Sequence, residues 1–187
     1  MSNSFTDLFI SQMGHAPTND QMVLIDRMSR FVTKQNGHWV YIIRGYAGTG
    51  KTTTVGALVR SLPKIGLQSQ LLAPTGRAAK VLSNFSGKRA FTIHKAIYQI
   101  KPGADGIARF TLAVNKSQNT IFIVDEASMI SDVGGLSAGK FVASRSLLDD
   151  LMEYVFSGHN CKLIFIGDIA QLPPVGMDIS PALEPKQ

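Results

Sequence analysis

The chain has 187 residues, 44% of them hydrophobic, which is enough for one domain with a buried core. Its 19 Lys and Arg residues against 13 Asp and Glu give a net charge of +6, which raises the expectation of a nucleic-acid partner only slightly. Cys161 is the single cysteine, no apolar run reaches membrane-spanning length, and the first residues lack a signal-peptide pattern, so we expect a cytoplasmic protein without internal disulfides or a membrane anchor.

Helices and strands are predicted to alternate along the chain. Thr18 and Gln21 form a capping-box pattern that opens a helix over about 18–35. Strands are predicted at 38–44, 69–74, 120–125 and 161–167, and further helices at about 51–61, 76–84, 93–99 and 144–157. This order predicts an α/β fold with a parallel sheet. The unbroken apolar run at 38–44 is typical of a central strand covered on both faces.

Three segments interrupt the alternation. Residues 100–119 contain two extended runs around Pro102-Gly-Ala-Asp-Gly106, a pattern that predicts a β-hairpin. The Gly-rich segment 131–143 is predicted to be a surface loop, and the Pro-rich tail 178–187 to be ordered only in part.

The strongest motif is Gly45-Tyr-Ala-Gly-Thr-Gly-Lys51-Thr52, a P-loop placed between a predicted strand and a predicted helix. Its backbone N–H groups would face the phosphates of a nucleotide such as ATP, at the positive end of the helix dipole. Lys51 would contact the β- and γ-phosphates, and the Thr52 hydroxyl would bind Mg²⁺. The residues predicted to hold the nucleotide are Gly45, Ala47, Gly48, Thr49, Gly50, Lys51, Thr52 and Thr53.

Acidic residues follow two later strands. Asp125 is predicted to hold the water shell of Mg²⁺, and Glu126 to be the general base that deprotonates the attacking water. The alternative is that both are solvated acids at a strand end. Gln171, in the turn after Asp168, either contacts the γ-phosphate and signals hydrolysis or belongs to an ordinary polar turn.

Five ordered motifs together resemble those of superfamily 1 DNA helicases, in the RecD-like and phage Dda-like branch. They are Gly45–Thr52, Leu72–Ala79, Thr92–Lys95, Val124–Ser128 and Gly167–Pro174. The resemblance covers about residues 15–177. It implies a three-layer RecA-like P-loop NTPase with a parallel central sheet and a small inserted β-hairpin, and an ATP-dependent motor that moves 5′ to 3′ on single-stranded DNA.

The resemblance also assigns roles to single residues. The family's adenine-contacting glutamine falls on Gln21, although the capping box explains the same residue. The DNA-contacting motif Ia falls on Thr75, Gly76 and Arg77, where Thr75 could equally be a helix cap. Motif Ib falls on Thr92, Ile93 and His94, with the same two readings.

In this branch a hairpin after motif Ib helps to separate the duplex, and segment 100–119 occupies that place. Phe110 either stacks on a base or packs the hairpin onto the domain. The family has two RecA-like domains with ATP between them, so we expect this chain to be the first one, with the second absent from the sequence. A P-loop kinase would leave motif Ia and Gly167–Pro174 unexplained. The intact Lys51, Thr52, Asp125 and Glu126 argue against a non-catalytic regulatory nucleotide-binding module.

Overall fold

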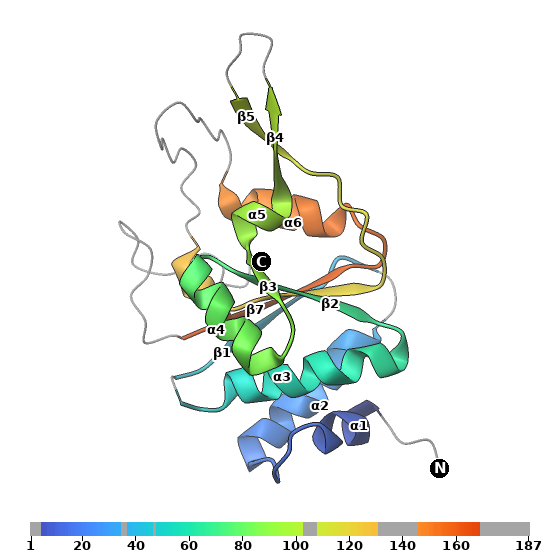
Figure 1. The fold of residues 1–187 in the computed structure, drawn as a ribbon. Helices are drawn as coiled ribbons and strands as arrows, with labels where there is room; N and C mark the ends of the chain where they lie inside the picture. Colours follow the sequence, from blue (N-terminus) through green and yellow to red (C-terminus); the bar gives the residue numbers. More distant parts are fainter. Residues whose placement is uncertain (1–4, 35–36, 47, 103–107, 131–145, 169–187) are drawn as a thin grey trace.

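The computed structural model describes residues 5–34, 37–46, 48–102, 108–130 and 146–168. A sheet lies between two layers of helices, and a two-stranded hairpin projects from one end (Figure 1). In chain order the elements are α1 (Phe5–Ser11), α2 (Asn19–Thr33), β1 (Val40–Arg44), α3 (Lys51–Ser61), η1 (Leu62–Ile65), β2 (Gln68–Ala73), α4 (Gly76–Ser86), β3 (Ala90–Thr92), α5 (Ile93–Ile97), β4 (Tyr98–Pro102), β5 (Ala108–Leu112), β6 (Thr120–Val124), η2 (Ala127–Met129), α6 (Leu147–Phe156) and β7 (Lys162–Gly167).

Local sequence signals explain several helix boundaries. The capping box at the start of α2 is present, because the Thr18 side chain accepts from the Gln21 N–H and the Gln21 side chain accepts from the Thr18 N–H. Thr75 caps α4, which ends at Gly87 in a left-handed conformation with φ 70°. The predicted helix over 18–35 is therefore confirmed to within two residues.

The main sheet has the order β1-β7-β6-β2-β3, and all four of its strand pairings are parallel. Its strands alternate their side chains between two separate cores. One core contains Ile43, Ile121 and Ile164 under α1, α2 and α3, and the other contains Phe122, Val124 and Phe165 under α5 and α6. The predicted three-layer α/β fold with a parallel sheet is confirmed.

The prediction that 38–44 forms a central strand is wrong for the described part of the chain. Among the described strands, β1 lies at one edge of the sheet and pairs only with β7. Val40, Tyr41 and Ile42 are accordingly half-buried, whereas every residue of β6 and β7 is buried. A long apolar run indicates that a strand is buried, but it does not indicate whether the strand pairs with one neighbouring strand or with two.

A buried lysine links the C-terminal end of α2 to the sheet by hydrogen bonds. Lys162, at the start of β7, is only 2% exposed. Its ammonium donates to the carbonyl oxygens of Phe31, at 3.3 Å, and Val32, at 2.7 Å, and also to that of Lys34. The Phe31 carbonyl also accepts from the Lys34 N–H at 3.4 Å, and the positive charge of Lys162 lies at the negative end of the helix dipole.

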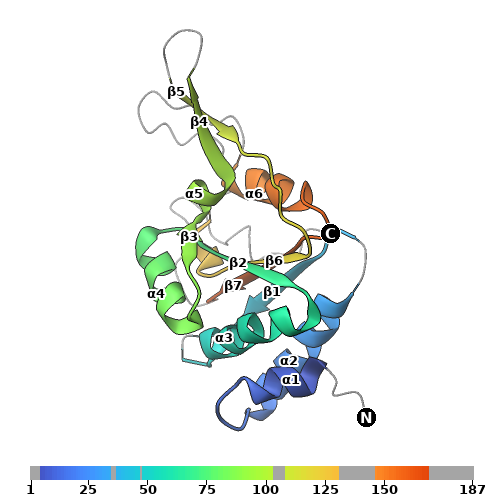
Figure 2. The same cartoon turned by 45° about the vertical axis from the view of Figure 1, so that its right-hand side comes forward.

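The second sheet is the predicted hairpin. β4 and β5 pair antiparallel, with Ile100 opposite Phe110, and Figures 1 and 2 both show the pair extending away from the main sheet. Its strands cover 98–112, so the hairpin starts and ends earlier than predicted. The predicted loop at 131–143 and the tail at 178–187 lie outside the described residues. No helix in the described part is both long and apolar enough to cross a bilayer.

Candidate functional site at the carboxyl edge of the sheet

The candidate residues follow the carboxyl ends of the five parallel strands, and strand order brings them together. Across the sheet, β1 is followed by the P-loop, β7 by Asp168, β6 by the Asp125–Glu126 pair and β2 by the turn that contains Thr75, while β3 ends at Thr92. The strand ends are level, because Arg44 lies opposite Gly167 and Val124 opposite Phe165. The Gly45 N–H donates to the Gly167 carbonyl at 3.3 Å. Ligands of open α/β sheets bind at this edge.

The P-loop backbone has the conformation that its glycines allow. Gly48 and Gly50 have φ of 78° and 80°, in the left-handed region that favours glycine. Gly50 is also the N-cap of α3, so the loop ends where unpaired N–H groups and the helix dipole can receive an anion. A Cβ at Gly50 would collide with the Gln21 side-chain nitrogen.

Lys51 is folded back over the loop. Its ammonium donates to the carbonyls of Gly45 and Tyr46 at 2.5 and 2.6 Å, which keeps the charge beside the loop. Thr49 closes the turn through a 2.9 Å hydrogen bond from its hydroxyl to the Tyr46 carbonyl. Thr52 is half-buried and Thr53 exposed in the first turn of α3. These residues fit a nucleotide: free N–H groups at a helix start and a nearby ammonium suit phosphates.

Gln21 caps α2 and also lies against the P-loop. Its side-chain oxygen accepts from the Thr18 N–H at 3.1 Å, and its side-chain nitrogen faces Gly50 of the P-loop. The residue is 8% exposed, so the amide is held in one orientation. The cap is therefore confirmed, and the amide also lies beside the nucleotide site. Whether it contacts adenine stays a prediction.

Asp125 and Glu126 are half-buried at the end of β6. Burial raises the pKa of Asp125, while the hydrogen bond from the Glu126 N–H and the charge of Lys51 lower it in part. Burial raises the pKa of Glu126 too, the neighbouring Asp125 raises it further, and Arg77 lowers it. A raised carboxyl pKa favours proton acceptance, so the surroundings of Glu126 suit a general base.

The pair is also shaped by its backbone. Glu126 has φ 53°, a left-handed conformation uncommon outside glycine. The Asp125 N–H donates to the Leu72 carbonyl of the adjacent strand, and this hydrogen bond fixes the backbone from which the Asp125 carboxylate extends. Strained backbone of this kind occurs often at functional sites.

The predicted DNA contacts lie on the other half of the same edge. The hydroxyls of Thr75 and Thr92 accept from N–H groups at 3.2 and 3.3 Å, so both are helix caps as well as candidate phosphate ligands. Gly76, Arg77 and His94 are exposed. Partial burial lowers the pKa of His94, which favours its neutral ring.

The hairpin is tied to this half by aromatic rings. The ring of Tyr98 lies 5.8 Å from that of His94 and 6.2 Å from that of Phe110. Phe110 is 52% exposed, and its ring packs on that of Tyr98. The Tyr98 hydroxyl donates to Asp150 of α6 at 2.6 Å, which anchors the base of the hairpin.

Sequence reasoning missed two of these connections. The influence of Arg77 on Glu126 joins residues that are far apart in the chain, and only the adjacency of β2 and β6 brings them near each other. The hydrogen bond from Tyr98 to Asp150 likewise joins distant residues, and Tyr98, which the sequence places both at the end of a predicted helix and in the first run of the predicted hairpin, lies in β4. Predicted site residues Ala47 and Gln171 lie outside the described residues.

Comparisons with known proteins agree with this geometry. The family described as "AAA domain" matches residues 26–178. The RecD2 DNA helicase of Deinococcus radiodurans, described as ATP-dependent, is 30% identical over 159 residues, which are 85% of this chain and 19% of that protein. The ATP-dependent DNA helicase dda of Enterobacteria phage T4 is 33% identical over 144 residues, 76% of this chain and 29% of that protein.

A third relative is the RecBCD enzyme subunit RecD of Buchnera aphidicola, 32% identical over 161 residues, 73% of this chain and 23% of that protein. The chain thus spans less than a third of the length of these three relatives. The expected resemblance is confirmed: the chain belongs to the AAA domain family of P-loop nucleotide-binding proteins and, within it, is similar to the motor domain of RecD-like superfamily 1 DNA helicases.

Proposed function

We propose that the chain is the ATP-binding and ATP-hydrolysing motor domain of a DNA helicase that moves 5′ to 3′ on single-stranded DNA, in DNA recombination, repair or replication in the cytoplasm. The observation that carries the proposal is the order of strand ends. Nucleotide-type residues follow β1, β7 and β6, and the candidate DNA contacts follow β2 and β3 of the same sheet.

On the nucleotide half, the P-loop N–H groups and Lys51 would bind the phosphates. Lys51 would exchange its present carbonyl partners for phosphate oxygens. Thr52 and Asp125 would hold Mg²⁺, which supplies charge neutralisation to the developing transition state. Glu126 would accept the proton of the attacking water, and Gln171 would sense the γ-phosphate.

Arg77 offers an electrostatic connection between the two halves. It is exposed in motif Ia and lowers the pKa of Glu126. A DNA phosphate bound by Arg77 would offset that positive charge.

A second RecA-like domain is the expected partner of this site. An arginine from a partner domain increases phosphoryl-transfer rates by about 10³–10⁵-fold in other NTPases. We therefore expect the 187-residue chain to bind ATP but to hydrolyse it slowly, and not to unwind DNA alone.

The test is ATP turnover and ATP affinity with and without single-stranded oligothymidylate, beside a Lys51→Ala variant. We expect Lys51→Ala to remove turnover and DNA to change the turnover or the ATP affinity of the unaltered chain. If turnover and affinity are the same with and without DNA, the motor proposal loses its support and a nucleotide-binding module that does not act on DNA takes its place.

A further inference from the structure

The outer face of α4 exposes apolar side chains. Its inner face packs Ala78, Ala79 and Leu82 into the domain, whereas Val81 and Phe85 are 46% and 63% exposed. Together with Arg77 they are spaced four residues apart, so they form one ridge along the helix. At 1.5 Å per residue the ridge is about 12 Å long. It begins at motif Ia and leads away from the carboxyl edge of the sheet.

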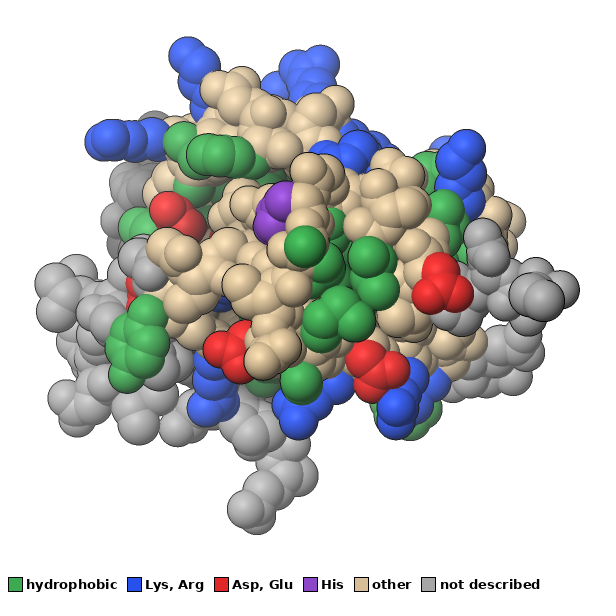
Figure 3. All heavy atoms as spheres, turned by 90° about the horizontal axis from the view of Figure 1, so that it is seen from below, with side chains coloured by type: hydrophobic (Ala, Val, Ile, Leu, Met, Phe, Trp, Pro, Cys, Tyr) green, Lys and Arg blue, Asp and Glu red, His purple; other side chains and the backbone are tan. Residues whose placement is uncertain are grey.

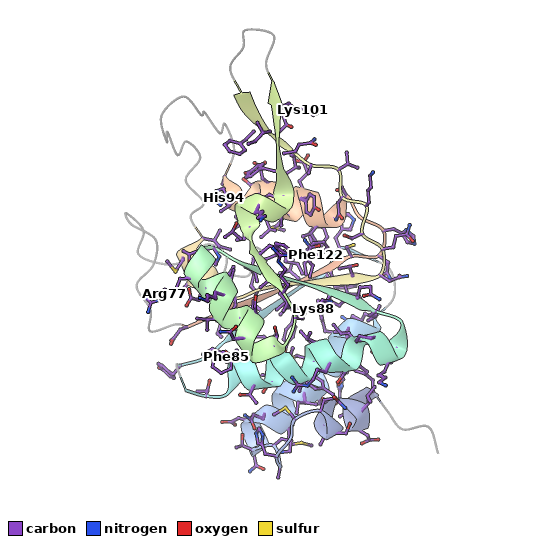
Figure 4. The ribbon with its side chains drawn as sticks, in the orientation of Figure 1. Arg77, Phe85, Lys88, His94, Lys101 and Phe122 are labelled. Atoms are coloured by element: carbon purple, nitrogen blue, oxygen red, sulfur yellow. The ribbon has the colours of Figure 1, made fainter. Side chains whose placement is uncertain are left out.

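The stretch of chain that carries this ridge is basic. Residues 27–104 hold 13 of the 19 Lys and Arg residues and none of the 13 Asp and Glu residues. Lys80, Lys88 and Arg89 lie on or directly after α4, and Figure 4 shows Arg77 near the upper end of this helix and Phe85 near its lower end, with Lys88 on the other side of the helix, by the segment that leads to β3. Lys and Arg side chains line the upper rim of the molecule in Figure 3, without Asp or Glu among them.

Two of these cations are held in place by neighbours. The Lys88 ammonium donates to the Ser69 hydroxyl at 3.0 Å, and the Arg89 guanidinium lies over the Phe91 ring, 5.0 Å from its centroid. A side chain that is already positioned loses less conformational entropy when it binds a ligand. Lys88 and Arg89, directly after α4, are therefore cations whose side chains are already positioned.

We propose that this α4 ridge is a second contact for single-stranded DNA, which continues from motif Ia along the outer face of the helix. One base stacks on Phe85, and phosphates lie near Lys80, Lys88 and Arg89. The ridge spans roughly three to four phosphate spacings of a stacked strand. The inference rests on the proposed DNA-motor function and extends its DNA footprint beyond motifs Ia and Ib.

The surroundings favour nucleic acid over a protein partner. The centre of a protein interface is depleted in charged residues. Here two apolar side chains stand among cations, and the combination of a free aromatic face with a basic track is the pattern of single-strand binding. A charge asymmetry of this size along a chain also points to a polyanion.

The experiment measures fluorescence anisotropy of labelled oligothymidylates of about 6 and about 16 nucleotides with the 187-residue chain. We expect Phe85→Ala to weaken binding of the long strand by about fivefold to a hundredfold, the range for one lost base stack, and to leave the short strand unchanged. Lys80→Ala should lower the salt dependence of long-strand binding by about 0.7 in log–log slope.

Matched variants distinguish the loss of a DNA contact from a loss of folding. Phe85→Trp keeps a stacking surface and should bind as the unaltered chain does, with fluorescence quenching on DNA beyond that of Trp39, the single native tryptophan. Arg30→Ala removes an exposed cation of α2 that is already paired with Asp26, and should change neither oligothymidylate's affinity nor its salt slope. Phe85→Ala should keep the unfolding midpoint, because the ring is mostly exposed.

Three results would overturn the inference, and they are distinguishable. If Arg77→Ala weakens both strands but Phe85→Ala and Lys80→Ala weaken neither, the ridge is no DNA contact and the motor proposal stands. If no oligothymidylate binds the unaltered chain, the motor proposal fails and the ridge proposal fails with it. If polyglutamate displaces the long strand as well as unlabelled oligothymidylate does, the ridge binds acidic protein segments and the assignment to DNA is wrong.

Discussion

The double placement of Gln21 leads to the sharpest test of the nucleotide site. Its oxygen caps α2 and its nitrogen faces the P-loop, so changing one end and keeping the other separates the two roles. Gln21→Glu keeps an oxygen that can accept from the Thr18 N–H but replaces the nitrogen donor with a negative oxygen. Gln21→Ala removes both ends.

The magnitudes follow from these contacts. Gln21→Ala loses the hydrogen bond to Thr18, about 0.5–1.5 kcal/mol, together with the packing of a side chain that is 8% exposed, so we expect about 1–2 kcal/mol of lost stability. Gln21→Glu should stay within about 0.5 kcal/mol of the original, because glutamate is also a regular capping-box residue.

The nucleotide affinity of Gln21→Glu should nevertheless fall. A carboxylate beside Gly50 repels phosphates by about 1–2 kcal/mol at an effective dielectric constant near 20, which means a fivefold to thirtyfold loss for ATP and GTP alike. If the amide also contacts adenine, ATP loses a further net hydrogen bond, and the preference for ATP over GTP falls by about two- to tenfold.

Urea denaturation followed by circular dichroism gives the stabilities, and titration calorimetry with Mg²⁺ gives the affinities for ATP and GTP. Unchanged affinity for both nucleotides in Gln21→Glu would show that Gln21 is a cap and nothing more. A loss of more than about 1 kcal/mol of stability in the same variant would refute the assigned capping geometry.

Three further outcomes follow from the structure. Lys162→Met should lose about 2–4 kcal/mol in urea denaturation, because buried carbonyls of α2 lose their donor, whereas the exposed Lys64→Met should change little. Tyr98→Phe should cost about 1–3 kcal/mol by removing the 2.6 Å hydrogen bond to Asp150, measured in the same way. Asp125→Asn, like removal of Mg²⁺ with EDTA, should abolish ATP turnover while circular dichroism shows the fold intact.

Each of these three predictions has an outcome that would contradict it. A Lys162→Met variant as stable as the original would mean that the desolvation of the ammonium cancels its hydrogen bonds. A Tyr98→Phe variant with unchanged stability would show that the hairpin is anchored by packing alone. Turnover that persists without Mg²⁺ would remove the metal from the proposed mechanism.

Much of the fold is readable from local signals. The capping residues Thr18, Thr75 and Thr92 and the glycines of the P-loop locate element ends, because caps and positive φ depend on a few adjacent residues. The short strand β3 and the helix α1 were not predicted, since neither has enough residues to show a clear period. The helix predicted over 93–99 ends two residues too late for the same reason, because a five-residue helix passes directly into a strand.

The site was predicted in its parts but not in its arrangement. The charge segregation around α4 could have been read from the sequence, since residues 27–104 contain no Asp or Glu. That Val81 and Phe85 are exposed could not, because an apolar residue on an amphipathic helix is normally assigned to the core. Which face of α4 is buried depends on where α3 and β3 pack.

The sequence by itself determined the chemical groups and their local geometry: a P-loop before a helix, two carboxylates after a strand, and hydroxyl caps at helix starts. These features span few residues and depend on backbone rules. Only the tertiary structure decided the strand order, which sets β7 beside the P-loop strand β1 and β6 beside β7, leaves β1 at the edge of the described sheet and brings Arg77 near Glu126. Strand order depends on packing between residues far apart in the chain, and no short pattern encodes it.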